Sequence, residues 1–231
     1  MTITSYSQRY EDARLWRALG GVECGFYIDV GAAFPKYESV TQLFYERNWR
    51  GINIEPTVSG YAALMRERHR DINLRVLVGS KDGQTTFYSV GLGNGLSTTR
   101  RDFADSYKEK GLIVEEFEEA CVTLDSIWTQ HVKGPVHFLK IDVEGAEKDV
   151  LDGCNFLLQR PWVVVIEATL PNTSTPTHDD WQAILDAADY RFVVFDGLNR
   201  FYVAQEHFAA ISPALREPIR PEHGFVQWNG Q

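Results

Sequence analysis

The stretch LKIDVEGAE, residues 139–147, contains three carboxylates within six positions. Asp142, Glu144 and Glu147 follow an apolar run that is typical of a buried strand, and Gly145 lies between the last two. Like charges this close repel one another unless they bind a proton, a cation or the positive N-terminal end of a helix. We interpret Asp142 as a residue for chemistry and Glu147 as a helix start, while both roles stay open for Glu144.

A further carboxylate, Glu167, ends the apolar run WVVVIEA. Neighbouring strands of a parallel sheet lie about 4.8 Å apart, so Asp142 and Glu167 could share a hard cation such as Mg²⁺. The polar loop that follows contains Asn172 and His178, which could supply a third ligand or a general base. The predicted catalytic residues are Asp142, Glu167 and His178, and the predicted metal ligands are Asp142, Glu167 and Asn172. Proton transfer to Asp142 without a metal is the alternative.

A cofactor site is indicated near the start of the chain. The turn DVGAA follows a first strand, and Glu55 ends a second strand 24 positions after Gly31, a separation that suits a carboxylate bound to ribose hydroxyls. The later glycines of a dinucleotide loop are absent, and Pro35 lacks an N–H for a phosphate. The pattern favours a nucleoside cofactor without phosphate, such as S-adenosylmethionine, with Asp29 accepting from its ammonium group.

The elements that must position these residues alternate between strands and helices. Such alternation predicts an α/β fold with a mostly parallel seven-stranded sheet, helices on both faces and a final antiparallel hairpin strand. Parallel sheets bind ligands at the carboxyl ends of their strands, where the candidate residues lie. The expected strands are 26–30, 51–55, 73–79, HFLKID, WVVVIEA and RFVVFDG, with a hairpin at KDGQ into TTFYSV, another at FDGLNRFYVA, and helices near 39–48, 58–69, 145–159 and 180–189. The segment VTLDSIW fits either a strand or a helix.

We expect one domain, residues 1–231, because repeats and Pro/Gly-rich linkers are absent from the sequence. Residues 1–22 resemble a short amphipathic helix, and residues 91–120, polar and then charged and helical, are a candidate lid. Residues 209–231 contain three prolines and suggest an arm that closes over the pocket or contacts a second subunit.

Bulk composition excludes several classes of partner. The net charge of −9 disfavours a nucleic-acid or anionic membrane surface. No apolar run approaches the roughly 20 residues of a transmembrane helix, and no signal peptide is evident. Three cysteines without a C-x-x-C pair favour reduced thiols in a cytoplasmic protein.

In combination, several stretches resemble the FkbM-type methyltransferases, which are Rossmann-like, S-adenosylmethionine-dependent O-methyltransferases. The stretches FYIDVGA, SVTQLFYERNWRGINIEP, VLVGSKDGQTTFY, VTLDSIW, HFLKIDVEGAEKDVLDG and VVVIEA occur in that order. The later EATLPN, H-x-x-W and FDGLNRFYVA resemble a subgroup associated with bacterial polysaccharide and glycan biosynthesis. Ala33, Phe34 and Pro35 depart from the usual continuation after DVGA.

The resemblance implies a role for each matching residue. Asp29 and Gly31, with Ala32, would lie at the methionine end of the cofactor, and Glu55, with Pro56, would hold the ribose. Asp142 would face the methyl group and the acceptor. The residues implied near the adenine are Ser80, Lys81 and Asp82.

The implied activity is methyl transfer to a sugar hydroxyl of a glycan or a glycosylated metabolite. An NAD-dependent sugar oxidoreductase or epimerase is a weaker alternative, because the phosphate loop and a Tyr-x-x-x-Lys pair are both absent from the sequence. A non-catalytic scaffold in a glycan assembly complex is the other alternative.

Overall fold

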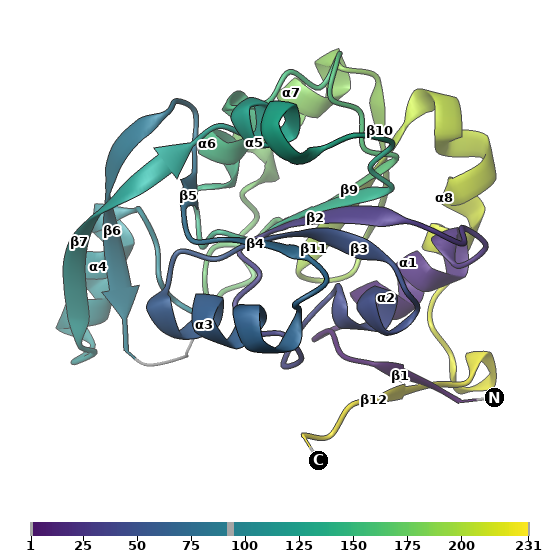
Figure 1. Cartoon of the computed structure of the whole chain (residues 1–231), viewed down its shortest axis with the longest axis horizontal. Coiled ribbons are helices and arrows are strands. Elements are labelled where there is room, and N and C mark those ends of the chain that lie inside the picture. Colours follow the sequence, from purple (N-terminus) through teal and green to yellow (C-terminus); the bar gives the residue numbers. More distant parts are fainter. Residues whose placement is uncertain (1, 92–94, 231) are drawn as a thin grey trace.

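The computed structural model describes residues 2–91 and 95–230, and a seven-stranded sheet forms its centre (Figure 1). The strand order is β10-β11-β9-β8-β2-β3-β4, and β11 runs antiparallel to both of its neighbours while the other pairings are parallel. This arrangement confirms the predicted α/β fold with its final antiparallel hairpin. The strands are β2 (Phe26–Val30), β3 (Arg50–Ile54), β4 (Ile72–Leu74), β8 (Phe138–Ile141), β9 (Val163–Glu167), β10 (Tyr190–Phe195) and β11 (Asn199–Ala204).

Helices cover both faces of this sheet, as predicted. One face packs against α5 (Leu124–His131), α6 (Glu147–Asp152) and α7 (Gln182–Ala187), drawn above the sheet in Figure 1. The other packs against α1 (Glu11–Leu19), α2 (Gln42–Glu46) and α8 (Phe208–Arg216). The central strands are buried on both faces, which explains their nearly continuous apolar runs. A further helix, α3 (Val58–Glu67), follows β3.

The strand order reverses between β2 and β8, and this reversal creates the site. In register, Val30 pairs with Ile141 at the carboxyl ends of the two strands. The backbone N–H of Asp142 then donates to the carbonyl of Val30 at 3.0 Å. The DVGA turn and the LKIDVEGAE stretch therefore leave the sheet side by side, at the point where such sheets bind ligands.

A second, three-stranded sheet corrects two expectations. It has the order β5-β7-β6, with β5 (Leu77–Val78) parallel and β6 (Gly83–Val90) antiparallel to β7 (Val114–Val122). The expected third strand, 73–79, is split between β4 and β5. The expected hairpin pairing at KDGQ is wrong, because β7 inserts between β5 and β6.

In the described part of the candidate lid, 91 and 95–120, the helix is α4 (Arg101–Glu109). The glutamate-rich end of the candidate lid forms β7 instead, since pairing with β6 along its whole length outweighs the low strand propensity of glutamate. Residues 92–94 of this segment lie outside the described part of the chain, and motion as a lid stays a prediction.

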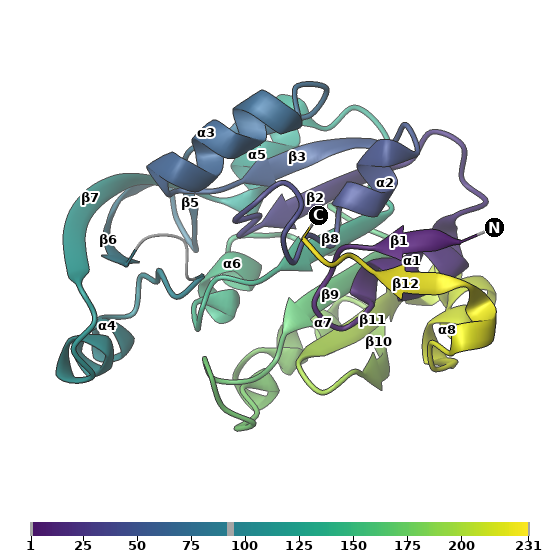
Figure 2. The same ribbon diagram turned by 90° about the horizontal axis from the view of Figure 1, so that it is seen from below.

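The first and last strands lie side by side (Figure 2), where β1 (Ile3–Ser5) pairs in parallel with β12 (Phe225–Gln227). Residues 1–22 contain the predicted helix as α1. The expectation of an arm at 209–231 is wrong for its first part, because α8 buries Ile211 and Leu215 in the core. This four-residue apolar spacing maintains a helix despite Pro213. The short 3₁₀ helices are His178–Asp180, Gln205–His207 and Pro221–His223.

The segment VTLDSIW forms the start of α5, which settles the choice between strand and helix. Thr123 caps this helix, and its hydroxyl accepts from the N–H of Ser126 at 3.1 Å. Within residues 2–91 and 95–230, no helix combines the length and the apolar character that a membrane span requires.

Candidate active site

A cavity of about 810 Å³ opens at the carboxyl ends of β2, β3 and β8. Its lining includes the DVGA turn, the loop that starts α3, the strand β5 and the LKIDVEGAE stretch. The facing wall comes from β6 and β7. The size is in the range of small-molecule sites, and the position agrees with the strand-end rule for parallel sheets.

The turn after β2 has a backbone that only glycine fits. Gly31 has a φ of +78°, and a Cβ built on it would lie 1.8 Å from the carbonyl oxygen of Asp142. The N–H groups of Gly31 and Ala32 are also fixed, because both donate to the carbonyl of Ile54 at the end of β3. The turn is thus fixed between β3 and β8, where a side chain at position 31 would not fit.

Glu55 lies at the end of β3 and lines the cavity, as predicted from its position. Its Oε2 accepts from the N–H of Ala33 at 2.9 Å, and its Oε1 accepts from the N–H of Thr57 at 2.8 Å. Burial raises the pKa of Glu55, and the hydrogen bonds from Ala33 and Thr57 partly offset this increase. The carboxylate therefore ties the DVGA turn to the start of α3, and Oε2 keeps a lone pair that a ribose hydroxyl could use.

The residues expected near an adenine are not among the described residues that line the cavity, and their role stays a prediction. Among the described residues, the lining of the cavity includes Val76, Leu77 and Val78 but not Ser80, Lys81 or Asp82. Asp82 instead accepts from the N–H of Thr123 and the hydroxyl of Ser126, so it stabilises the start of α5. The strand β5 ends at Val78, and residues 80–82 connect it to β6. A flat base would contact the apolar strand before the turn.

Lys140 connects two carboxylates beneath the cavity. Its Nζ lies 3.6 Å from Asp29 Oδ1 and 3.2 Å from Asp142 Oδ2, and it donates to the carbonyl of Gly31 at 3.0 Å. Asp29 is buried and also accepts from the hydroxyl of Thr41. The ammonium partner expected for Asp29 in a cofactor is therefore present in the protein itself. The sequence shows Lys140 as the nearby positive charge but gives no sign that it bridges two strand ends.

Three carboxylates converge at the ends of β8 and β9. One oxygen each of Asp142, Glu144 and Glu167 lies within 4.8 Å of the other two. Two unit charges at that separation near a protein surface repel by about 3 kcal/mol. Burial, and then the charge of Asp142, raises the pKa of both Glu144 and Glu167. The cluster therefore has a strong tendency to take up a proton or a cation.

Glu144 reaches this cluster through an unusual backbone. Its φ is +53°, a left-handed conformation that costs a non-glycine residue of the order of 1 kcal/mol or more. Glu147 holds the loop, since its Oε1 accepts from the N–H groups of Val143 and Gly145, both at 3.1 Å. The hydroxyl of Thr98 donates to the carbonyl of Glu144 at 2.8 Å. Glu147 begins α6, as expected, and the open question over Glu144 is answered in favour of the cluster.

Asn172 and His178 are not shown to join the cluster. Asn172 is exposed, with a φ of +56°, in the loop after β9. The nearest charged partner of the half-buried His178 is Asp179 of the same 3₁₀ turn, at 3.5 Å. Within the described residues, neither side chain lines the cavity. Their predicted roles as ligand and base stay predictions. The third carboxylate beside Asp142 and Glu167 is that of Glu144.

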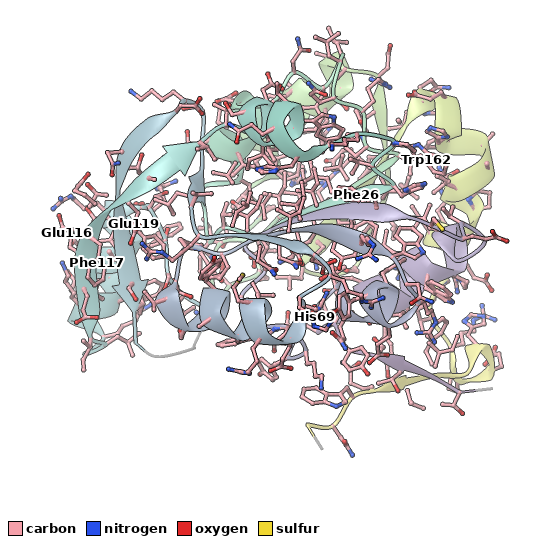
Figure 3. The ribbon with its side chains drawn as sticks, viewed as in Figure 1. Phe26, His69, Glu116, Phe117, Glu119 and Trp162 are labelled. Atoms are coloured by element: carbon pink, nitrogen blue, oxygen red, sulfur yellow. The ribbon has the colours of Figure 1, made fainter. Side chains whose placement is uncertain are left out.

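The wall opposite the strand ends combines aromatic and acidic side chains. Alternate residues of β7, Glu115, Phe117 and Glu119, line the cavity, together with Phe87, which pairs with Phe117 in the ladder. Figure 3 labels Phe117 and Glu119 on β7. The intervening Glu116 lies on the other face, 3.5 Å from Arg101 of α4. In VEEFEEACV the apolar residues Val114, Phe117 and Ala120 are three positions apart, which favours a helix, so the expectation of a helical segment is wrong here.

Comparison with known proteins places these features in a family. The chain matches the methyltransferase FkbM domain over residues 29–192, which contain Asp29, Glu55, Asp142 and Glu167. A solved structure, the 1,6-didemethyltoxoflavin-N1-methyltransferase of Burkholderia thailandensis with 1,6-didemethyltoxoflavin and S-adenosylhomocysteine bound, is 12% identical, with a TM-score of 0.42. That likeness covers 84% of this chain and 75% of the other. Comparison with curated proteins finds no match. Because the family match spans well over half of the sequence, this chain belongs to the FkbM methyltransferase domain family.

Proposed function

We propose that this protein is an S-adenosylmethionine-dependent O-methyltransferase that acts on a hydroxyl of a sugar, in a glycan or a glycosylated metabolite. The observation that carries the proposal is the position of Asp142. The residue lines the cavity at the strand-order reversal with a half-buried side chain, and its backbone carbonyl lies against Gly31. A carboxylate in that position could orient an acceptor hydroxyl and take up its proton.

The cavity suits a nucleoside cofactor without phosphate. Glu55 offers an acceptor for a ribose hydroxyl, and Val76, Leu77 and Val78 offer an apolar surface for a base. Lys140 is the only basic residue in the part of the lining that the structure describes, and it is already paired with Asp29 and Asp142. A surplus of carboxylates favours the positively charged sulfonium cofactor over a pyrophosphate-bearing one.

For this reaction the protein has two tasks: to position the acceptor hydroxyl and to accept its proton. S-adenosylmethionine, when bound, supplies a methyl group on an activated sulfur. Asp142 and its neighbours would hold the acceptor oxygen in line with that methyl group and accept the hydroxyl proton. Asp142 is fixed for this task by the ammonium of Lys140. A divalent metal at the same carboxylates would lower the pKa of the hydroxyl.

The β7 wall supports a sugar as the acceptor. Phe117 is 45% exposed and presents an aromatic surface on which the C–H face of a sugar ring can stack. Glu115 and Glu119 on the same face can accept hydrogen bonds from several hydroxyls. The same acidic surface would repel a phosphate-bearing acceptor.

Titration calorimetry with S-adenosylhomocysteine tests the cofactor, and the absence of binding heat would overturn the proposal. Incubation with labelled S-adenosylmethionine and a panel of free and lipid-linked glycans tests the acceptor. Asp142→Asn should abolish methyl transfer and leave the affinity for S-adenosylhomocysteine within about threefold, because the residue faces the acceptor rather than the nucleoside.

A further inference from the structure

We infer that Asp142, Glu144 and Glu167 bind one hard divalent cation, of the Mg²⁺, Mn²⁺ or Ca²⁺ class. Their three oxygens lie within 4.8 Å of one another. Oxygens on opposite sides of such a cation are about 4.2 to 4.8 Å apart, because the metal–oxygen distance is about 2.1 to 2.4 Å. The three carboxylates can therefore reach a common ion with little movement. The inference deepens the proposed function, on which its catalytic meaning rests.

Unsatisfied oxygens in the cluster point independently to a missing partner. Glu167 is only 7% exposed, yet its Oε2 lies fully buried without a hydrogen-bond donor among the described residues. The Oε2 of Glu144 is in the same state. Buried carboxylate oxygens in folded proteins are normally hydrogen-bonded or bound to a metal. A cation bound by the three carboxylates would supply a partner for the buried charge of Glu144 and Glu167.

The nearby Lys140 does not take this role. Its Nζ contacts Oδ2 of Asp142, Oδ1 of Asp29 and the carbonyl of Gly31. The ammonium group of Lys140 is thus paired with Asp29 and Asp142. Among the described residues, no basic side chain forms an ion pair with Glu144 or Glu167. The second oxygen of Asp142 remains available to a cation on the β9 side.

The backbone of the LKIDVEGAE stretch is built to present Glu144. Its left-handed conformation is maintained by Glu147, through the N–H groups on both sides, and by Thr98. Strain of this kind is characteristic of functional positions. Glu147 is therefore a positioning residue, which fixes the loop without contacting the ion.

The cavity gives the ion access to an acceptor. Asp142 and Glu144 both line the cavity, whereas Glu167 is buried behind them. Three carboxylates fill part of a shell of six to eight oxygens, and the remaining positions open toward the cavity. A sugar with two neighbouring hydroxyls could occupy two of them. An ion in this position would make a bound acceptor hydroxyl more acidic.

Binding of Mn²⁺ to the metal-stripped full chain, followed by the electron paramagnetic resonance signal of free Mn²⁺, tests the site without any turnover. We expect one saturable site from which Mg²⁺ or Ca²⁺ displaces Mn²⁺. Glu144→Gln and Glu167→Gln should each weaken Mn²⁺ binding at least about tenfold. Asp149→Asn removes an exposed carboxylate from the adjoining helix and should leave the affinity within twofold of the natural protein.

The possible outcomes distinguish a failure of the cation site from a failure of the proposed methyltransferase function. The inference is overturned if no saturable site is found, or if the two glutamine variants are folded by circular dichroism and bind Mn²⁺ as Asp149→Asn does. If Glu167→Gln does not fold because Glu167 is buried, the Mn²⁺ affinity of Glu144→Gln alone decides the test, since Glu144 is only half-buried. Calorimetry with S-adenosylhomocysteine runs in parallel. Cofactor binding without Mn²⁺ binding contradicts only the cation site, and Mn²⁺ binding without cofactor binding contradicts only the proposed function.

Discussion

The ammonium group of Lys140 lies 3.2 Å from the carboxylate of Asp142 and 3.6 Å from that of Asp29, so a single buried charge joins two neighbouring strand ends. The side chain of Lys140 is only 9% exposed. The charges of Asp142 and Asp29 outweigh the cost of burial and raise its pKa well above the usual range, so the lysine stays charged. The active-site geometry therefore depends on a residue that need not touch any ligand.

Lys140→Met should lower the free energy of unfolding by about 3 kcal/mol or more, because it leaves the buried Asp29 without a counter-charge. Urea denaturation measures this loss. Asp29→Asn in the same background should recover part of it, so that the double variant is less destabilised than the sum of the two single variants. Purely additive losses would show that the two residues do not act as a pair.

Gly31→Ala should fold poorly and lose affinity for S-adenosylhomocysteine. The added Cβ would lie 1.8 Å from the carbonyl oxygen of Asp142, at a φ of +78° that alanine rarely adopts. Thermal unfolding and calorimetry measure the two effects. Gly21→Ala is the matched control, since a Cβ there meets no atom within 4 Å and should change stability by less than about 1 kcal/mol. Equal behaviour of the two variants would contradict the close approach of β2 and β8.

The central sheet and the strand-end residues were predictable because burial on both faces leaves a strong apolar signal. Asp142, Glu55 and Glu167 follow such runs directly, and parallel pairing then places their strand ends along one edge. The family resemblance was also visible in the order of the motifs. The local apolar pattern was therefore sufficient to predict the strands that cross the core.

Features that depend on long-range pairing were not predictable. The sequence VEEFEEACV has a poor strand composition, and only its pairing with β6 makes it the wall of the cavity. Nothing local shows that the expected strand 73–79 is divided between β4 and β5, or that Asp82 beyond it contacts the start of α5. Glu144 joined the cluster only through a left-handed backbone maintained by Glu147.

Phe117→Ala should raise the KM for a glycan acceptor about fivefold, because stacking on an aromatic ring contributes about 1 kcal/mol. The affinity for S-adenosylhomocysteine should stay within twofold, since the residue lies on the β7 wall, opposite the strand ends. Phe195→Ala is the control, as Phe195 is also 45% exposed but lies on β10. A parallel loss of cofactor affinity would assign Phe117 to the cofactor rather than to the acceptor.

Glu11→Gln should raise the stability of the protein by about 2.5 kcal/mol more at pH 8 than at pH 5. Burial, and then the charge of Asp196, raises the pKa of Glu11 to about 7. A carboxyl with a folded pKa above its unfolded value contributes stability that is present below about pH 4.5 and is lost as the pH rises through 7.

The full loss is about 3 kcal/mol for this shift of the pKa, and glutamine avoids it because it cannot ionise. Glutamine also keeps an oxygen that can accept from Asn199, at 2.8 Å in the glutamate, while the N–H of Arg9 loses its acceptor at both pH values. Urea denaturation of both proteins at the two pH values measures the difference, with the exposed Glu23→Gln as the control for loss of a carboxylate. An equal effect of Glu11→Gln at pH 5 and pH 8 would mean that Glu11 ionises equally in the folded and unfolded chain.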